Sequence, residues 1–287
     1  MTVSIVMATY NRAATLPRAV ASVLSQTEPD WELIIVDDGS TDETPALVAE
    51  MTDPRIRVYR HSPNRGVTAA KNAGLDRIRG EWFTTLDSDD EMIPDALAAM
   101  LDCAERTGAT AIECNCTDTV TGAMSGIGPI ADGWMTAHDH AQCRGEHWGL
   151  TRTELLGDMR FNDRLPGFES TLWLKIDTRA KRYYLHRALL IYHTEGADRI
   201  CVAAPQTSFR RKLETYTILG EDGEYLSALK ARVMRDTVTR SPESGSHASC
   251  GPSCPPSGRV RRDSVVTGRY RVPTSPMTLA GFPATIA

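Results

Sequence analysis

The sequence predicts an α/β protein with a mostly parallel sheet flanked by helices. Short apolar, β-branched segments alternate with segments of helical spacing through the first hundred residues, and this alternation indicates βαβ crossovers between parallel strands. Polar clusters also follow three of the four expected strands directly. In an open parallel sheet, ligands bind at the carboxyl ends of the strands. The same pattern therefore predicts a fold and the edge at which it binds a ligand.

The expected elements of the first half follow one another with short turns. Strands are expected at 3–8, 31–36, 56–59 and 82–86, and helices at 16–24, around 46–48 and at 66–78. Apolar residues recur at helical spacing in the first of these helices. Ser40 or Thr41 is expected to cap the second, because both hydroxyl residues precede its apolar positions.

The pattern becomes weaker after residue 95. Residues 117–145 show little periodicity and are expected to form loops or short antiparallel strands. One or two amphipathic helices are expected within 205–235. The other expected elements are helices at 96–104, 150–156 and 170–181, and strands at 110–113 and 187–193.

The last 48 residues have a different composition. Pro, Gly and Ser make up 20 of the residues 240–287, and six Arg stand against one Asp and one Glu. Such a segment buries too little apolar surface to offset its ordering entropy, so we expect disorder. The chain is therefore divided into 1–95, 96–239 and 240–287.

Composition narrows the classes of function. The formal net charge is -5, whereas nucleic-acid binders usually carry a clustered basic excess. No run approaches the roughly 18 apolar residues of a membrane helix, and the N-terminus lacks the basic region of a secretory signal. Seven scattered cysteines fit a reducing compartment. We expect a cytoplasmic protein with no transmembrane segment and no nucleic-acid partner.

The segment DSDD, residues 87–90, follows the fourth expected strand. Asp87 and Asp89 are two residues apart, so in extended chain their carboxylates project to the same side. Two neighbouring carboxylates favour a hard cation, and Mg²⁺ or Mn²⁺ typically joins such groups to substrate phosphates. The glycine-rich motifs G-x-G-x-x-G and G-x-x-x-x-G-K-[ST] are absent. The remaining interpretation is a cation-dependent diphosphate site without a glycine-rich loop.

Four segments, VSIVMATYNR, WELIIVDDGSTDET, NRGVTAAKNAGL and GEWFTTLDSDD, together resemble the inverting glycosyltransferases of family 2. The resemblance is dense over residues 3–95 and weaker to about residue 193. It implies a GT-A fold with a Rossmann-like sheet. Residues 1–95 would then bind a nucleotide sugar, and 96–239 would form the acceptor side and the C-terminal helices.

The resemblance also assigns the donor nucleotide. Ala8, Thr9 and Tyr10 match residues that line the base pocket, with Tyr10 packed on the uracil face. Asp38 would accept a hydrogen bond from the base, which favours uracil. Lys71 stands where the family usually has Arg; it keeps a positive charge for the diphosphate but lacks the bidentate fork.

A cation site follows from the same resemblance. Asp89 matches the metal-binding acid, and Asp87 and Ser88 match positions near the ribose and the metal. His193, at the end of the last expected strand, is the candidate third ligand. Mn²⁺ or Mg²⁺ is the implied cofactor.

Glu169, in GFESTLWLKI, matches the position of the catalytic base. The family often has an acidic pair there; Phe168 occupies the place of the first acid. Glu can deprotonate a hydroxyl as Asp does, with one more methylene of reach. The implied reaction is a single displacement that inverts the anomeric carbon.

A second group of possible ligands lies in HDHAQCRGEH. It consists of His138, His140, Cys143 and His147. Their spacing matches no strong zinc signature, and we favour a loop that shapes the acceptor cleft. Cys114 and Cys116 are two residues apart in an expected strand and are interpreted as core thiols.

Alternatives stay open at this point. One alternative is a GDP- or dTDP-sugar as donor, and another is a protein that binds a nucleotide sugar without catalysis. A pure assembly surface is disfavoured by five acidic residues at the strand ends. The acceptor hydroxyl belongs to a saccharide, a lipid-linked saccharide or a small molecule, and peripheral contact with the inner face of a membrane is compatible with all three.

Overall fold

The computed structural model describes residues 2–136, 139, 143–165, 168–195, 215 and 217–238. The chain divides into two compact units, Met1–Ser241 and Pro242–Ala287. Every described residue belongs to the first unit. The expected disorder over 240–287 and much of the expected helical region 205–235 lie outside the described residues. No helix in the described part of the chain is long and apolar enough to cross a membrane.

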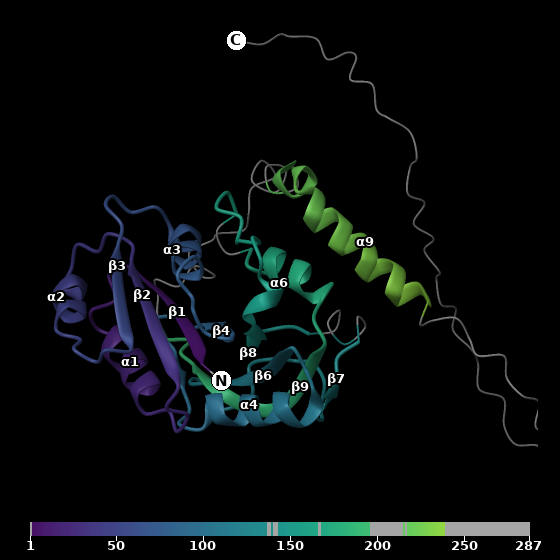
Figure 1. The fold of residues 1–287 in the computed structure, drawn as a ribbon, viewed down its shortest axis with the longest axis horizontal. Coiled ribbons are helices and arrows are strands. Elements are labelled where there is room, and N and C mark those ends of the chain that lie inside the picture. The colour runs from purple at the N-terminus through teal and green to yellow at the C-terminus, as the bar shows by residue number, and fades with distance from the viewer. Residues whose placement is uncertain are drawn as a thin grey trace, which may run out of the picture. The chain divides into compact units, whose positions relative to one another are not determined.

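A sheet of nine strands forms the centre of the described unit (Figure 1). Its first four strands run parallel in the order β3-β2-β1-β4. They are β1 (Val3–Thr9), β2 (Trp31–Asp37), β3 (Ile56–Arg60) and β4 (Trp82–Thr85). The predicted parallel half is confirmed, and the carboxyl ends of these strands share one edge.

The second half of the sheet is mixed. β8 pairs antiparallel with both β4 and β6, and β6 runs parallel to β9. Two short strands, β5 and β7, pair antiparallel with β9. The bounds are β5 (Glu91–Met92), β6 (Ala111–Asp118), β7 (Gly133–Trp134), β8 (His147–Arg152) and β9 (Arg182–Tyr192).

The helix predicted at 150–156 is wrong. These residues continue β8 and then form the short 3-10 helix η1 (Thr153–Leu155). Trp148 and Leu150 are buried on the core face of the strand, and β8 hydrogen-bonds to a strand on each side. This pairing outweighs the helical preference of the residues that follow, as tertiary contacts often do.

Two hydrophobic clusters lie on opposite faces of the sheet. The helices α1 and α4 contribute to the first cluster, and α3 and α6 contribute to the second; α9 packs beside α6 (Figure 1). The helices are α1 (Leu16–Leu24), α2 (Thr44–Ala49), α3 (Val67–Leu75), α4 (Ala96–Thr107), α6 (Ser170–Asp177) and α9 (Gly223–Val238). Both faces of the parallel strands are thus covered, as buried parallel sheets require.

Helix α3 approaches β1 very closely. A Cβ added at Gly74 would lie 2.3 Å from Cγ1 of Val6, far inside van der Waals contact. The helix therefore rests on the strand at a separation that only glycine allows at this position.

The predicted cap of α2 is also wrong. Its N-cap residue is Glu43, which makes no capping hydrogen bond through its side chain. The Ser40 hydroxyl instead accepts a hydrogen bond from the backbone N–H of Asn11, at 2.9 Å. The hydroxyl is used to join two strand ends rather than to begin a helix.

Candidate functional site

The loops that follow β1 and β2 are joined by hydrogen bonds. Besides the contact between Asn11 and Ser40, the backbone N–H of Thr41 donates to Oδ1 of Asn11 at 2.8 Å. Asn11 has a φ of 52°, a left-handed conformation that Asn tolerates better than most residues. The two polar clusters predicted to meet are therefore in direct contact.

The loop after β4 joins the same edge through arginines of the first loop and of α1. Nε of Arg12 lies 3.9 Å from Oδ2 of Asp89, and Arg18 donates to the backbone carbonyl of Asp89 at 2.6 Å. All three polar clusters thus lie together at the carboxyl edge of the parallel strands.

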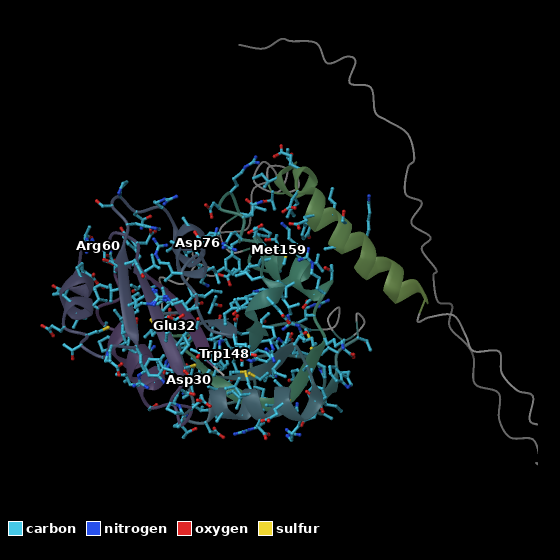
Figure 2. The ribbon with its side chains drawn as sticks, in the orientation of Figure 1. Asp30, Glu32, Arg60, Asp76, Trp148 and Met159 are labelled. Atoms are coloured by element: carbon cyan, nitrogen blue, oxygen red, sulfur yellow. The ribbon has the colours of Figure 1, made fainter. Side chains whose placement is uncertain are left out.

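The two acids after β2 anchor the β3 side of this edge. Asp37 is fully buried and pairs with Arg60, labelled in Figure 2, at 2.8 Å. Asp38 accepts hydrogen bonds from the backbone N–H groups of Arg65 and Gly66, at 3.0 and 2.7 Å, and lies 2.7 Å from Nδ1 of His61. A nucleotide base that reached Asp38 would share the aspartate carboxylate with the two backbone N–H groups and the imidazole of His61.

The residues predicted to bind the donor nucleotide sugar differ in exposure. Tyr10 is 44 % exposed at the sheet edge, whereas Ala8, Thr9 and Ser88 are 9 %, 3 % and 5 % exposed. Only the tyrosine ring therefore offers a large free surface on which a base could stack.

One buried lysine joins two of the predicted site residues. Lys71, in α3, is 2 % exposed. Its Nζ lies 2.8 Å from Oδ1 of Asp87 and 2.5 Å from Oε1 of Glu169. Glu169 is the N-cap residue of α6, so this contact connects the parallel half of the sheet with the second half across 98 positions of the chain.

The charges of this bridge stabilise one another. Burial alone would lower the pKa of Lys71, but attraction to Asp87 and then to Glu169 outweighs it and raises the pKa above its ordinary value. The same ammonium lowers the pKa of Asp87 against the effect of burial. Lys71 is therefore cationic, and Asp87 is ionised, throughout the neutral range.

His193 is placed differently from Asp89. Its backbone N–H donates to Oδ1 of Asp90 at 2.9 Å, and its Nε2 lies 2.7 Å from Oε1 of Glu91. Among the described residues, Asp89 and His193 share no group of three potential ligand atoms within 4.8 Å of one another. A shared metal ion at these two residues stays a prediction that requires His193 to leave Glu91.

Asp90 is a site residue that the sequence analysis did not single out. It is 4 % exposed, and burial, with smaller contributions from Asp87, Asp89 and Glu146, raises its pKa from 3.8 to about 8. The Asp90 carboxyl group is therefore largely protonated at neutral pH, and it lies near the carboxylates of Asp87 and Asp89.

Asp90 is expected to make stability depend on pH. Between about pH 4 and pH 8 its carboxyl is ionised in the unfolded chain and protonated in the folded chain, so the native state binds more protons and stability falls as pH rises. We expect the unfolding free energy of the wild type, relative to Asp90→Asn, to decrease through this window and level off above it. Urea unfolding of both proteins from pH 4.5 to 9, at roughly unit steps, measures the difference. A constant difference would contradict a protonated Asp90.

The predicted cysteine–histidine cluster is described only in part. His138 and His140 lie outside the described residues. Cys143 and His147 are described, and they lie beside Glu113 of β6. Cys114 and Cys116 are fully buried and not in a disulfide, which confirms their interpretation as core thiols.

Comparisons with known proteins agree with this architecture. A family model described as glycosyl transferase family 2 matches residues 4–123. The chain is 32 % identical over 216 residues to GalNAc(5)-diNAcBac-PP-undecaprenol beta-1,3-glucosyltransferase of Campylobacter jejuni, covering 72 % of this chain and 69 % of that protein. It is 47 % identical over 107 residues to the succinoglycan biosynthesis protein ExoO of Rhizobium meliloti, covering 37 % and 31 %.

Solved structures show the same fold. S. aureus TarS 1-349 in complex with UDP-GlcNAc superposes with a TM-score of 0.63 at 19 % identity, covering 72 % of this chain and 62 % of that one. Its complex with UDP gives 0.59 at 21 %, covering 68 % and 61 %. The chain thus spans about three fifths of these structures. Taken with the sheet order, the polar edge and the Campylobacter relative, these likenesses establish that the chain belongs to glycosyltransferase family 2 and has the GT-A fold.

Proposed function

We propose that the protein transfers a sugar from a UDP-sugar to an acceptor hydroxyl, with inversion at the anomeric carbon and with Mn²⁺ or Mg²⁺ as cofactor. The contact of Lys71 with Asp87 and Glu169 carries this proposal. It sets a buried cation, a candidate base and the acidic loop after β4 side by side at the ligand-binding edge of the sheet.

Glu169 accepts the proton of the acceptor hydroxyl in this reaction. Its side chain is 37 % exposed, so an acceptor can reach it, and its contact with Lys71 fixes its direction. The acceptor oxygen forms a bond to the anomeric carbon as the bond to the diphosphate breaks. The diphosphate leaves with the electron pair, and the proton stays on Glu169.

Lys71 orients the donor end of the site. Its ammonium is a fixed positive charge in contact with both Asp87 and Glu169. Such a charge would stabilise the departing diphosphate, and electrostatic stabilisation of this kind is often a large part of catalysis. Tyr10 offers its exposed ring to the base.

The loop after β4 fits a hard divalent cation. Burial raises the pKa of Asp90, and the nearby charges of Asp87 and Asp89 raise it further, so the three carboxyl groups lie close together. Carboxylate oxygens of this kind suit Mg²⁺ or Mn²⁺. Asp89 would hold the ion, with Asp87 close to it. When bound, it would neutralise charge on the leaving diphosphate.

A lipid-linked saccharide is the acceptor that the relatives favour. The Campylobacter relative is named for an undecaprenol diphosphate saccharide. WfgD of Escherichia coli, 39 % identical over 95 residues, is named for UDP-Glc and a diphosphoundecaprenol saccharide. We propose the same acceptor class here, reached by peripheral contact at the inner face of a membrane.

Titration of UDP into the metal-stripped protein tests the donor site. We expect Mn²⁺ to tighten UDP binding by at least about tenfold, because Asp89 would hold the ion and the ion would neutralise charge on the diphosphate. Asp89→Asn should remove this gain, and Asp158→Asn, which changes an exposed carboxylate, should retain it. Calorimetry with UDP, GDP and dTDP in parallel measures the base preference.

Three results would contradict the proposal. Absence of UDP binding by the folded protein in either condition would exclude the donor site. Tighter binding of GDP or dTDP than of UDP would replace the donor. Binding without turnover of UDP-sugars on any hydroxyl acceptor would favour the non-catalytic alternative.

A further inference from the structure

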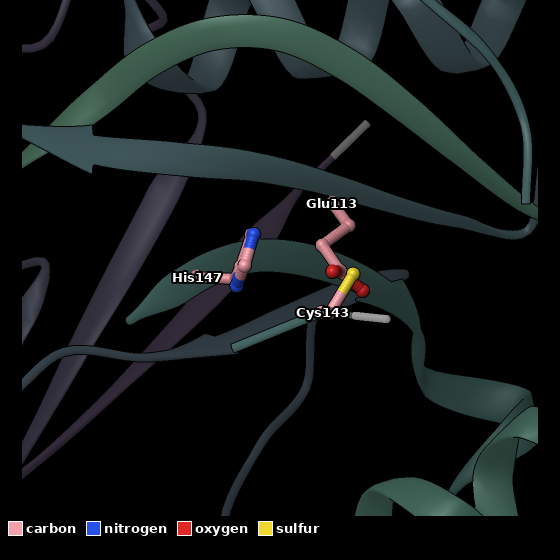
Figure 3. Close-up of side chains that lie close together, drawn as sticks. All are labelled: Glu113, Cys143 and His147. Carbon is pink, nitrogen blue, oxygen red and sulfur yellow. The ribbon is translucent and has the colours of Figure 1, made fainter. Parts of the chain in front are cut away.

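A cysteine, a histidine and a glutamate lie together on the second half of the sheet. Glu113 belongs to β6, His147 begins β8, and Cys143 precedes β8 by four residues. One ligand atom of each, Sγ, an imidazole nitrogen and a carboxylate oxygen, lies within 4.8 Å of the other two. Figure 3 shows the three side chains lying close together.

Strand pairing explains why they meet. In the antiparallel β6–β8 pair, Glu113 lies opposite Gly149 and Asn115 lies opposite His147. Glu113 and His147 are thus diagonal neighbours on one face, within reach of long side chains. Gly149 has no side chain to fill the place between them.

The imidazole of His147 is oriented as a metal ligand would be. Its Nε2 is buried and has no hydrogen-bond partner among the residues that the structure describes. The ring makes a hydrogen bond to the backbone of Gly145. A backbone carbonyl commonly fixes the tautomer of a ligating histidine in this way, and Nε2 is then the ring nitrogen left to bind a cation.

Two glycines let the chain pass close over these atoms. A Cβ at Gly126 would lie 2.5 Å from Nε2 of His147, and one at Gly128 would lie 3.0 Å from Sγ of Cys143 and 3.4 Å from Nε2 of His147. Asn115, which is buried, holds Gly126 by donating to its carbonyl and accepting from its N–H, both at 2.8 Å. The covering segment is thus fixed from the strand beneath it.

The charges leave Glu113 available as a ligand. Arg182 donates two hydrogen bonds to Asp177, at 2.9 and 2.6 Å. It lies 3.7 Å from the Glu113 carboxylate, which is longer than a hydrogen bond. The guanidinium balances one negative charge beside the group without occupying the carboxylate.

We propose that Glu113, Cys143 and His147 bind a thiolate-preferring divalent cation, with Zn²⁺ as the natural occupant. Thiolate, imidazole and carboxylate are the three ligand types of protein zinc sites. Bond lengths of about 2.0–2.3 Å put the ligand atoms of a tetrahedral zinc site about 3.5 Å apart. Side-chain rotations that move the ligand atoms by roughly 1 Å would therefore bring all three within bonding distance of one ion. The cation would tie the segment before β8 to β6.

Cobalt absorption tests this site without relying on turnover. The protein carries Ser in place of Cys201, Cys250 and Cys254, and excess Mg²⁺ and UDP are present to occupy an all-oxygen donor site. We expect one equivalent of Co²⁺ to produce a sulfur-to-metal charge-transfer band, which Zn²⁺ abolishes by displacement. Oxygen ligands alone give no such band, so the outcome is independent of the proposed donor site.

Variants assign the ligands. Cys143→Ser should abolish the band, and His147→Gln should weaken Zn²⁺ binding by at least about 100-fold, since loss of a ligand exceeds the 10–100-fold cost of losing its supporting partner. Glu113→Gln should weaken it by at least about tenfold, and Glu105→Gln on the exposed face of α4 should leave it unchanged.

Gly128→Ala provides a second test of the zinc site, because this variant keeps all three proposed ligands. Its added methyl would intrude beside the sulfur, so we expect a folded protein with Zn²⁺ affinity reduced by at least about tenfold. A cobalt spectrum without the charge-transfer band, or a band that persists in folded Cys143→Ser, would overturn the proposal. Undiminished zinc affinity in folded Gly128→Ala would overturn it as well.

Discussion

Glu169→Gln is expected to lower the rate of sugar transfer by about 10²–10⁴-fold, the usual contribution of a general base. The amide has nearly the same shape but cannot accept the acceptor proton. Lys71 keeps its contact with Asp87, at 2.8 Å, so its ammonium stays paired and the protein should fold. Steady-state release of UDP gives the rate, and calorimetry should show that the affinity for UDP is little changed.

The matched control is Glu154→Gln. Glu154 lies in η1 and is exposed, so its loss should leave the rate within about twofold, as surface changes away from a site usually do. A fully active Glu169→Gln enzyme would exclude Glu169 as the base. Loss of UDP affinity in the variant, at an unchanged rate under saturation, would assign Glu169 to donor binding instead.

The double variant Asp87→Asn/Glu169→Gln is expected to reduce the free energy of unfolding by about 3–5 kcal/mol at pH 7, the cost of leaving a buried charge without its counter-charge. The side chain of Lys71 is 3 % exposed and would lose both carboxylates at once. Each single variant should cost much less, because one carboxylate remains. The two changes are therefore expected to be strongly non-additive in urea unfolding.

The pH dependence and a third substitution identify the cause of that loss. In the double variant the folded-state pKa of Lys71 should fall, because burial then acts without attraction. Stability relative to wild type should recover as pH rises toward about 10, where the unpaired lysine is neutral. Adding Lys71→Met should recover stability at pH 7. A small, additive loss would contradict the view that the bridge neutralises a buried charge.

The parallel half of the fold is predictable because its signals are local. Buried parallel strands produce apolar runs, and the chain then changes to helical spacing within a few residues. The error at 150–156 has the opposite origin. β8 is defined by partners in β4 and β6, which lie dozens of residues away, and no periodicity within seven residues reveals them.

The site is predictable only where one motif contains it. DSDD and its strand are contiguous, so their position at the sheet edge follows from the sequence. The contact between Lys71 and Glu169 spans 98 positions and depends on how α6 packs. Asp90 is likewise an ordinary acid in the sequence, because its raised pKa comes from burial that only the folded loop provides.

The cysteine–histidine group shows the same limit from another side. Cys143 and His147 are close in the sequence and can be recognised as a pair. Glu113 is thirty positions upstream and reaches them only through the register of β6 with β8. The ligand set thus mixes a local pattern with a diagonal contact, and a search by spacing finds only the first part.

The close approach of α3 to β1 has a consequence for the charge that the helix carries. Gly74 lies three positions after Lys71, on the same side of α3, and has no room for a methyl group against Val6. A side chain at Gly74 would push α3 away from the sheet, and the Lys71 ammonium would be displaced with the helix. The lack of a side chain at Gly74 therefore sets how far the Lys71 ammonium lies from its carboxylate partners. One helical turn thus meets both the steric requirement of close packing and the electrostatic requirement of the ion pairs.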